Sequence, residues 1–288
     1  MSHVGRGMHN NLDSSLISRP SSLLKTYTAF MAVATFFLVI AGGMVTSTGS
    51  ALAVPDWPLS FGQFFPKMEG GVFYEHGHRM IAATIGVLTI ILAIWIWRKA
   101  EEPLLRKAGW IALGLVCAQG ILGGVTVLLR LPAVTSVGHA CLGQIFFSWV
   151  CCIAAMTWSE PIAARIEQAS KLRRLAFMTT GFIFFQLIFG AIYRHTGTLL
   201  HMHFLGALLV FVHIILLFKR VRKSIPQDPW FTRPATILFS LLFVQIGLGI
   251  YTWQQPEILN ATAHVAVGAL LLATSSVLSL ESLRRVAV

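Results

Sequence analysis

Charged residues are scarce in this sequence. Asp, Glu, Lys and Arg make up 11% of its 288 residues, whereas 56% are hydrophobic and the mean hydropathy is +0.73. Soluble globular domains carry about 25% charged residues. The shortage of charge therefore excludes an ordinary soluble domain and predicts an integral membrane protein.

Acidic residues are scarcer than basic ones, at 11 against 22, which leaves a formal net charge of +11. The basic residues are spread over short loops, so the charge does not indicate a nucleic-acid partner. We expect it to set the membrane topology and to contact anionic lipid.

Cysteine is also rare. The four cysteines all lie within apolar stretches: Cys117, Cys141, Cys151 and Cys152. A structural disulfide would need cysteines in loops that face an oxidising compartment. The sequence therefore excludes an outer-loop disulfide, and we expect these side chains to be small packing residues.

Eight apolar stretches are long enough to cross about 30 Å of hydrocarbon. They cover residues 24–47, 73–97, 108–130, 135–158, 175–193, 200–218, 235–254 and 260–279. An even number places both termini on one side. Because 18 of the 22 basic residues lie on that side, we predict that it is the cytoplasm. The polar tail lacks the pattern of a mitochondrial transit peptide, which favours a bacterial inner membrane.

The two halves of the sequence repeat one another. The string Q-x-x-L-G-x-x-T begins at Gln119 and again at Gln245, and H-x-x-x-G begins at His139 and His264. This pattern predicts an all-α membrane protein made of two tandem, duplicated four-helix bundles. The expected division is a cytoplasmic tail, an N-terminal bundle, a cytoplasmic linker and a C-terminal bundle, at residues 1–23, 24–158, 159–174 and 175–288.

Four histidines occupy equivalent places in the repeats, 61 residues apart within each half and 125 apart between halves: His78, His139, His203 and His264. Each lies near the expected outer end of an even-numbered span, and facing helices of a bundle can supply two axial imidazoles to one iron. The sequence thus predicts two bis-histidine haem sites. A zinc site would need further Cys or carboxylate ligands, which this pattern lacks.

The spacing does not decide which histidine of each H-x-H pair is the ligand. His76 and His201 are also 125 residues apart, and a two-residue step turns about 200° around a helix, so only one histidine of each pair faces inward.

One turn after their histidines, Gly143 and Gly268 are expected to leave room for a flat macrocycle. We expect Gln119 and Gln245 to be interhelical hydrogen-bond partners.

The repeats differ beside the first histidine. Glu75 precedes His78 by three residues, whereas the equivalent position in the second half is Leu200. A carboxylate in the first half alone indicates that chemistry occurs there, by proton transfer or charge stabilisation. The alternative is a salt bridge between Glu75 and Arg79 or a helix N-terminal charge.

Three arginines are expected at the outer boundary, where haem propionates would emerge: Arg79, Arg130 and Arg194. Arginine binds carboxylates through paired hydrogen bonds, so we predict propionate contacts for them. The alternative is contact with lipid headgroups.

Glu75, His78 and Arg79 form an E-x-x-H-R motif, preceded by G-G-M-V-T-S-T-G-S at residues 42–50 and P-D-W-P at residues 55–58. These motifs in this order, with eight spans in two repeats, resemble the haem A synthase family over nearly the whole chain. The resemblance selects His78 over His76 and, through the repeat, His203 over His201.

The resemblance implies an enzyme that oxidises the C8 methyl of haem O to a formyl group, with water as the oxygen source and Glu75 required. Substrate haem would lie between His78 and His139, and a haem B cofactor between His203 and His264. Haem O synthase and the cytochrome oxidase assembly machinery would be partners, with a quinone or another redox protein as electron acceptor. Homo-oligomers are compatible with the sequence.

The chain departs from the family in its outer segments. Val54 and Ser60 stand where many relatives have cysteine, and Thr46 stands where relatives tend to have arginine. The aromatic segment 57–65 is expected to form an amphipathic lid. Two other functions explain the histidines: a bis-histidine electron-transfer cytochrome, or a haem carrier for oxidase assembly.

Overall fold

The computed structural model describes residues 20–159, 164–165 and 169–287, and within them the chain forms eight long helices. Their bounds are α1 Ser22–Ser47, α2 Gly71–Lys99, α3 Pro103–Leu128, α4 Ala133–Trp158, α5 Ala169–Thr196, α6 Leu200–Ser224, α7 Pro229–Gln254 and α8 Ile258–Arg284. All eight are long and apolar enough to cross a membrane. The predicted all-α membrane fold is confirmed.

The observed helices extend a few residues beyond the predicted spans. α5 begins at Ala169, so the second part of the expected linker 159–174 is helical. A short parallel pair that the sequence did not predict joins β1 (Ala164–Arg165) to β2 (Val286–Ala287). The predicted tail lies mostly outside the described residues.

Local sequence signals explain several helix starts. The Ser21 side chain accepts a hydrogen bond from the Leu24 amide at 3.2 Å, and Asp228 accepts one from the Trp230 amide at 2.9 Å. Such caps satisfy backbone donors that have no partner within the helix. Pro103 and Pro229 are the first residues of α3 and α7, where a missing amide hydrogen costs nothing.

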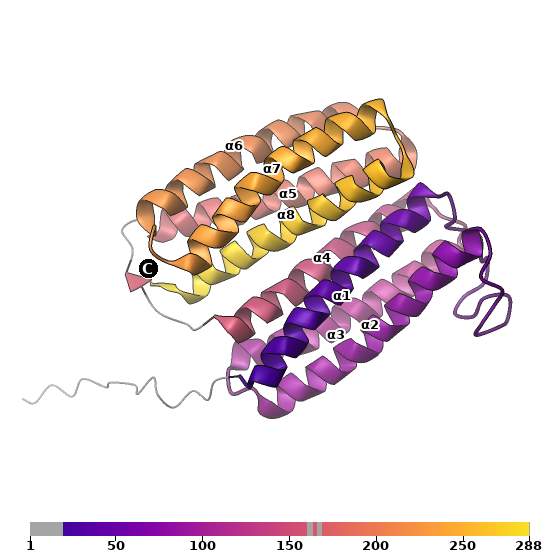
Figure 1. Ribbon diagram of the computed structural model, residues 1–288, viewed down its shortest axis with the longest axis horizontal. Coiled ribbons are helices and arrows are strands. Elements are labelled where there is room, and N and C mark those ends of the chain that lie inside the picture. The colour runs from indigo at the N-terminus through magenta and orange to yellow at the C-terminus, as the bar shows by residue number, and fades with distance from the viewer. Residues whose placement is uncertain (1–19, 160–163, 166–168, 288) are drawn as a thin grey trace, which may run out of the picture.

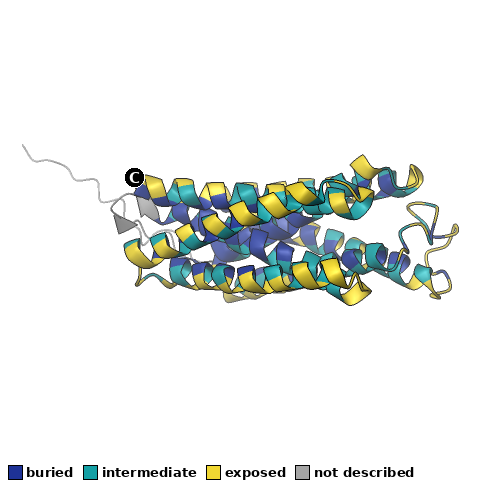
Figure 2. Ribbon diagram, turned by 90° about the horizontal axis from the view of Figure 1, so that it is seen from above, coloured by how far each residue is buried: buried dark blue, intermediate teal, exposed yellow. Residues whose placement is uncertain are grey.

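The helices form two bundles that lie side by side, α1–α4 and α5–α8 (Figure 1). Half or more of the residues in the apolar 18-residue stretch of α4 and of α8 are buried, against less than a third in every other described helix. Phe147 of α4 packs there with Ala269 and Ala273 of α8, and the buried residues follow the middle of the molecule (Figure 2). α4 and α8 are therefore the shared wall between the bundles.

The two ends of the bundles differ. One end carries the long segment 48–70 between α1 and α2, together with the first residues of α2, α4, α6 and α8; we call it the loop end (Figure 1). The other end carries the beginning of α1 and the end of α8, and we call it the terminal end. The histidines have the same spacing in both repeats, so the histidine-bearing parts of the even-numbered helices lie together at the loop end.

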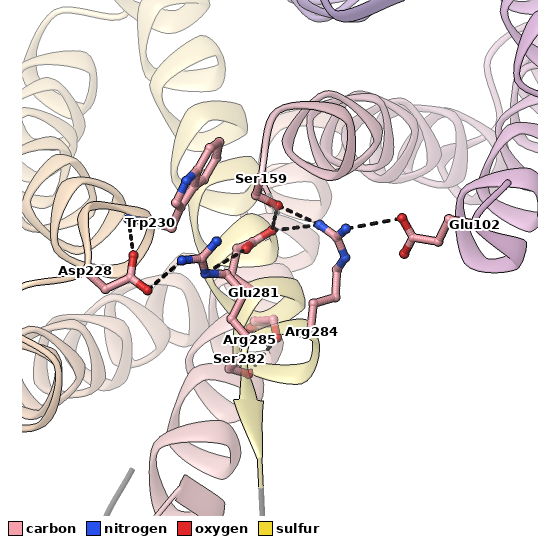
Figure 3. Close-up of polar contacts among 9 residues, drawn as sticks. Glu102, Ser159, Asp228, Trp230, Glu281, Ser282, Arg284 and Arg285 are labelled. Atoms are coloured by element: carbon pink, nitrogen blue, oxygen red, sulfur yellow. Dashed lines mark hydrogen bonds and ion pairs between the residues drawn. The ribbon is translucent and has the colours of Figure 1, made fainter. Parts of the chain in front are cut away.

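A polar cluster joins the bundles at the terminal end (Figure 3). Glu281 of α8 is fully buried, and its Oε1 accepts a hydrogen bond from the Ser159 hydroxyl at 2.9 Å. Arg284 lies 3.3 Å from both Glu281 and Glu102, and Arg285 lies 2.9 Å from Asp228. Because buried charges depend on their partners, this cluster fixes α8 against both bundles.

Candidate functional site

The four predicted ligands lie at the same depth. His78, His139, His203 and His264 each fall within about two turns of the start of an even-numbered helix, at the loop end. At 1.5 Å rise per residue, they lie roughly 5–11 Å along the helix axis from those starts. One layer of the molecule therefore contains all four imidazoles.

Each imidazole rests against a glycine of the preceding helix. A Cβ on that glycine would lie only 2.8–3.1 Å from the histidine Cε1, in the pairs Gly42 with His78, Gly123 with His139, Gly190 with His203 and Gly249 with His264. Any larger residue would push the ring away. The glycines of the repeat thus give all four imidazoles a common orientation.

The two histidines of the C-terminal bundle face each other. Their ring centroids are 6.2 Å apart, with ring planes at 70°. A metal–imidazole bond is about 2.0–2.1 Å long, so two such bonds in line plus the two ring radii fit this separation. The Gln186 carbonyl oxygen lies 3.3 Å from His203 Nδ1. The Gln186 amide nitrogen lies 3.0 Å from the same Nδ1 and 3.3 Å from Nε2, so Gln186 contacts both ring nitrogens.

Several buried ring nitrogens have no hydrogen-bond partner, among them Nε2 of His76, which is not a predicted ligand. Among the described residues, Nδ1 of His78, His139 and His264 is buried without a hydrogen-bond partner. A buried imidazole normally finds a partner because an unpaired polar group costs free energy. Both pairs are donor sets that fit a haem iron with two axial imidazoles.

Glutamines accompany three of the four histidines. Gln119 Nε2 lies 3.0 Å from the His139 carbonyl oxygen, Gln186 Nε2 lies 3.0 Å from His203 Nδ1, and Gln245 Nε2 lies 3.4 Å from His264 Nε2. The interhelical role predicted for Gln119 and Gln245 is confirmed. Gln186 was not predicted, although it precedes Gly190 by four residues, as Gln119 precedes Gly123.

The glycines that follow two of the histidines lie beside glutamine side chains. A Cβ on Gly143 would lie 3.0 Å from Gln119 Nε2, and one on Gly268 would lie 3.4 Å from Gln245 Nε2. Gly143 therefore makes room for the Gln119 amide, whereas the closest neighbour of a Cβ on Gly268 would be Leu187, at 3.0 Å. The room that they were expected to leave for a macrocycle stays a prediction.

Glu75 is buried at the start of α2, with 3% of its surface exposed. Its Oε2 accepts a hydrogen bond from the Val54 amide at 2.8 Å, and its Oε1 accepts one from Arg79 at 2.5 Å. The salt bridge considered as the alternative role is therefore present. The same carboxylate fixes the start of the outer segment to α2.

Arg79 binds the outer segment as well as Glu75. Its guanidinium donates to the carbonyl oxygens of Asp56, Leu59 and Val54, at 2.7, 3.0 and 2.9 Å. These contacts hold segment 48–70 against α2. The propionate contact of Arg79 stays a prediction.

His76 and His78 point to different surroundings. His76 Nδ1 lies 2.8 Å from the Ser60 hydroxyl of the outer segment, whereas His78 lies against Gly42 of α1. In the second half, His201 is exposed and His203 contacts Gln186. These surroundings agree with the choice of His78 and His203 as ligands.

The outer segment covers part of the N-terminal bundle. The Trp57 ring lies so close to α3 that a Cβ on Gly124 would be 2.6 Å from it. Asp56 accepts hydrogen bonds from the amides of Gly62 and Phe61 at 2.9 and 2.8 Å, which lowers the pKa of Asp56. On the outside, Phe64 and Phe65 are 76% and 80% exposed. The segment thus packs Trp57 on α3 and exposes two phenylalanines, and its role as a lid stays a prediction.

The other two arginines have different surroundings. Arg130 is exposed in the turn between α3 and α4, with a positive φ of 61°. Arg194, near the end of α5, donates to the Gly43 carbonyl at 3.0 Å, the Ser47 hydroxyl at 2.6 Å and the Ala261 carbonyl at 3.3 Å. It links the two bundles, and propionate binding by Arg130 and Arg194 stays a prediction.

Comparison with known proteins gives a consistent result. A family model described as cytochrome oxidase assembly protein matches residues 68–202, which include Glu75, His78 and His139. A haem A synthase of Bacillus licheniformis is 28% identical over 173 residues, 58% of this chain and 57% of that protein. One of Alkalihalophilus pseudofirmus is 32% identical over 108 residues, 36% of each chain. Over these residues the chain is similar to haem A synthases.

The match to haem A synthases is partial in length. The chain spans less than two thirds of these relatives, at 57% and 36% of their lengths. A protohaem IX farnesyltransferase of Halobacterium salinarum is also 28% identical over 131 residues, 46% of this chain and 28% of that protein. The region matched by the family model ends before His203 and His264, whose pairing therefore comes from the repeat and the geometry.

The outer segment is held without a disulfide. All four cysteines are free. The Val54 amide donates to Glu75, and the Ser60 hydroxyl lies 2.8 Å from His76 Nδ1. Thr46 bonds the Gly42 carbonyl of its own helix at 3.4 Å. Polar contacts to α2 thus attach the segment to the N-terminal bundle.

Proposed function

We propose that this chain is a haem A synthase, which oxidises the C8 methyl of haem O to a formyl group. Water supplies the oxygen in two successive hydroxylations. Overall, one methyl group and one water give one formyl group, four protons and four electrons. The observation that carries the proposal is the buried Glu75 carboxylate beside one of two otherwise equivalent histidine pairs.

The two pairs are proposed to have different occupants. His78 and His139 hold the substrate, haem O, because Glu75 lies on the His78 helix three residues away. His203 and His264 hold haem B, which supplies one-electron redox chemistry when it is bound. Arg79, Arg130 and Arg194 are the candidate propionate contacts at the loop end.

Glu75 is proposed to act on the water or on the carbon being oxidised. Its contacts with Arg79 and the Val54 amide hold it as a fixed anion, and each oxygen has a second lone pair. Such an anion accepts a proton from attacking water or stabilises positive charge at the methyl carbon. No equivalent carboxylate occurs in the second half, where Leu200 takes this place.

The proposed location is a bacterial inner membrane, with the terminal end in the cytoplasm. The support is the concentration of Lys and Arg in the connections at that end. Haem O synthase would supply the substrate, and oxidase assembly would consume the product. The four electrons require an acceptor, for which a quinone or a second redox protein is suitable.

A bis-histidine electron-transfer cytochrome is the second candidate function. It is favoured by the salt bridge and amide contact that already engage both oxygens of Glu75. On this view the carboxylate only holds the outer segment. A matched pair of variants separates the two functions.

The test is coexpression of the full chain with a haem O synthase, followed by chromatography and mass spectrometry of the extracted haems. Glu75→Gln removes the charge of the carboxylate, and Arg79→Gln removes its ion-pair partner and three contacts to the outer segment. If Glu75 takes part in the chemistry, Glu75→Gln abolishes haem A while Arg79→Gln retains measurable product. Equal losses of haem A in the two variants would show that Glu75 only attaches the outer segment. Haem-loaded wild-type protein that yields only haems B and O would overturn the proposal.

A further inference from the structure

An open groove with a volume of about 330 Å³ lies between α5 and α6 at the terminal end, and we call it the α5–α6 groove. It is lined by Lys171, Arg174, Leu175 and Met178 of α5 and by Arg220 of α6. The four histidines lie at the opposite end of the helices, so the groove is separate from the candidate haem sites.

The lining of the groove changes from charged to apolar along α5. Lys171, Arg174, Leu175 and Met178 are spaced by three, one and three residues, so they share one face of the helix. The two cations stand within the first two turns of α5, and Met178 lies about 10 Å deeper along the span than Lys171. Arg220 stands four residues before the end of α6, at a matching depth. The groove therefore has a cationic mouth at the membrane boundary and an apolar wall below it.

The cationic mouth has no acidic residue on either of its helices. Neither α5 nor α6 contains Asp or Glu, and their ends at this point carry seven basic residues, at positions 171, 173, 174, 219, 220, 222 and 223. The first acidic residue after α6 is Asp228, which is paired with Arg285 at 2.9 Å. Within the part of the chain that the structure describes, Lys171 and Arg174 have no acidic partner.

The position of two of these cations adds to the uncompensated charge. The first turn of a helix is the positive end of its dipole, where acidic side chains are favoured and basic ones are not. α5 begins with no acidic residue in its first turn, and Lys171 and Arg174 follow at once. The mouth of the groove is therefore suited to an anion that comes from outside the protein.

The N-terminal bundle has a groove of similar size at the same end, which we call the α2 groove. It has a volume of about 340 Å³ and is lined by Ile91, Ile94, Trp95, Arg98 and Lys99. Its two cations are consecutive on one helix, so they point about 100° apart. Two acidic residues, Glu101 and Glu102, follow within three positions.

The repeat relates the two grooves and shows where they differ. The step of 125 residues that relates His78 to His203 also relates Trp95 to Arg220. An aromatic side chain in the first bundle is thus replaced by a cation in the second. Both grooves lie at the end rich in basic residues, so membrane topology alone does not explain three cations from two helices around one of them.

We propose that the α5–α6 groove binds an anionic phospholipid of the leaflet at the terminal end, with its phosphate at the cationic mouth and an acyl chain along the apolar wall. Lys and Arg donate charge-assisted hydrogen bonds to phosphate oxygens, and basic pockets between membrane helices suit such headgroups. A zwitterionic headgroup brings a cation that the mouth repels. A soluble anion would leave the apolar wall uncovered, where Met178 is 40% exposed.

The test is native mass spectrometry of the purified, delipidated full chain, titrated with phosphatidylglycerol or with phosphatidylcholine of the same acyl chains. We expect one phosphatidylglycerol to bind more tightly than further copies, and phosphatidylcholine to lack this first tight step. Lys171→Gln with Arg174→Gln should weaken the step by roughly 25-fold, because each cation beside an anionic lipid strengthens binding about fivefold. Equal binding of the two lipids by the wild type would overturn the proposal.

Arg98→Gln with Lys99→Gln is the matched control. It removes the same charge from exposed side chains of the α2 groove, at the same end of the molecule. The first tight binding step should keep its affinity in this variant. Equal losses in the two double variants would show a diffuse attraction by the net charge and would overturn the site.

Thermal unfolding with added lipid gives a second measurement, since a ligand of the folded state raises the midpoint temperature. Without lipid, both double variants should unfold like the wild type, because all four replaced side chains are exposed. Phosphatidylglycerol should raise the midpoint of the wild type and of the α2 groove variant, but not of the α5–α6 groove variant. Glycerophosphoglycerol, the headgroup without acyl chains, should not displace the bound lipid at equal concentration. Displacement would assign the groove to a soluble anion and overturn the lipid assignment.

Discussion

The imidazole of His139 lies against Gly123, with its Cε1 only 2.8 Å from the point that a Cβ would occupy. We predict that Gly123→Ala displaces this ring at a cost of about 1–3 kcal/mol, the usual penalty of overpacking. The N-terminal site should lose haem, measured as haem per protein by absorbance and mass spectrometry.

Gly120 provides the control for this substitution. It lies on the same helix, and nothing lies within 4 Å of a Cβ added to it. Gly120→Ala should keep full haem content and stabilise α3 slightly, because alanine is the better helix former. Equal haem content in the two variants would show that Gly123 does not limit the position of His139.

The hydrogen bond between Ser60 and His76 is predicted to hold the outer segment. Ser60→Ala leaves a buried imidazole without its partner, which typically costs about 1–3 kcal/mol. Hydrogen exchange of segment 48–70 should become faster, while the cores of the helices are unchanged. Lys67→Ala breaks a highly exposed pair with Glu69 and should have no such effect; identical exchange in both variants would contradict the prediction.

Glu281 is predicted to dominate the stability of the terminal end. Glu281→Gln leaves Arg284 and Arg285 without their shared buried anion, and losing one partner of a buried ion pair costs about 3–5 kcal/mol. We expect the midpoint temperature of thermal unfolding in detergent to fall by several degrees. Glu257→Gln, at an exposed position with no side-chain cap, should unfold like the wild type. A Glu281 variant as stable as this control would show that the cluster does not hold α8.

Asp56 is predicted to make the stability of segment 48–70 depend on pH in the acid range. The amides of Gly62 and Phe61 lower the pKa of Asp56 in the folded protein, so protonation of its carboxylate disfavours the fold. Its contribution is complete above the unfolded value of about 3.9 and is lost as the pH falls through the lower folded value. Protection factors of segment 48–70 should therefore stay constant from neutral pH to about pH 4 and fall below it.

Asp56→Asn is the matched variant for this pH dependence. It keeps the size of the side chain but has no charge to lose, so protection should already be reduced at neutral pH. The difference between the variant and the wild type should shrink as the wild-type carboxylate becomes protonated. A difference that persists unchanged at low pH would refute the role of the charge.

The positions of the helices and histidines were predictable because each depends on a local or repeated signal. Apolar length determines a span, and the repeat relates His78 to His203 and His139 to His264. Gln186 was missed because its surroundings do not repeat the L-G-x-x-T string that follows Gln119 and Gln245. The four-residue step to Gly190 would have identified it.

Other features depend on contacts between distant parts of the chain. Arg79 reaches carbonyls 20–25 residues away along the sequence, and those distances depend on the path of the outer segment. Glu281 lies just beyond the predicted end of the last span, so its burial was not foreseen. The sequence also could not predict that α4 and α8 lie between the bundles, because an apolar surface that faces lipid and one that faces protein have the same composition.

The wall made by α4 and α8 has a consequence for synthesis of the protein. A chain that emerges from the N-terminus inserts α4 long before α8, so the α4 surface around Phe147 first meets lipid or insertion factors. α8 completes that wall last, and Thr262 of α8 also packs on Gly43, next to the glycine that supports His78. The surroundings of His78 are therefore completed only at the end of translation, and truncation after α7 would damage the bundle made first as well as the one made last.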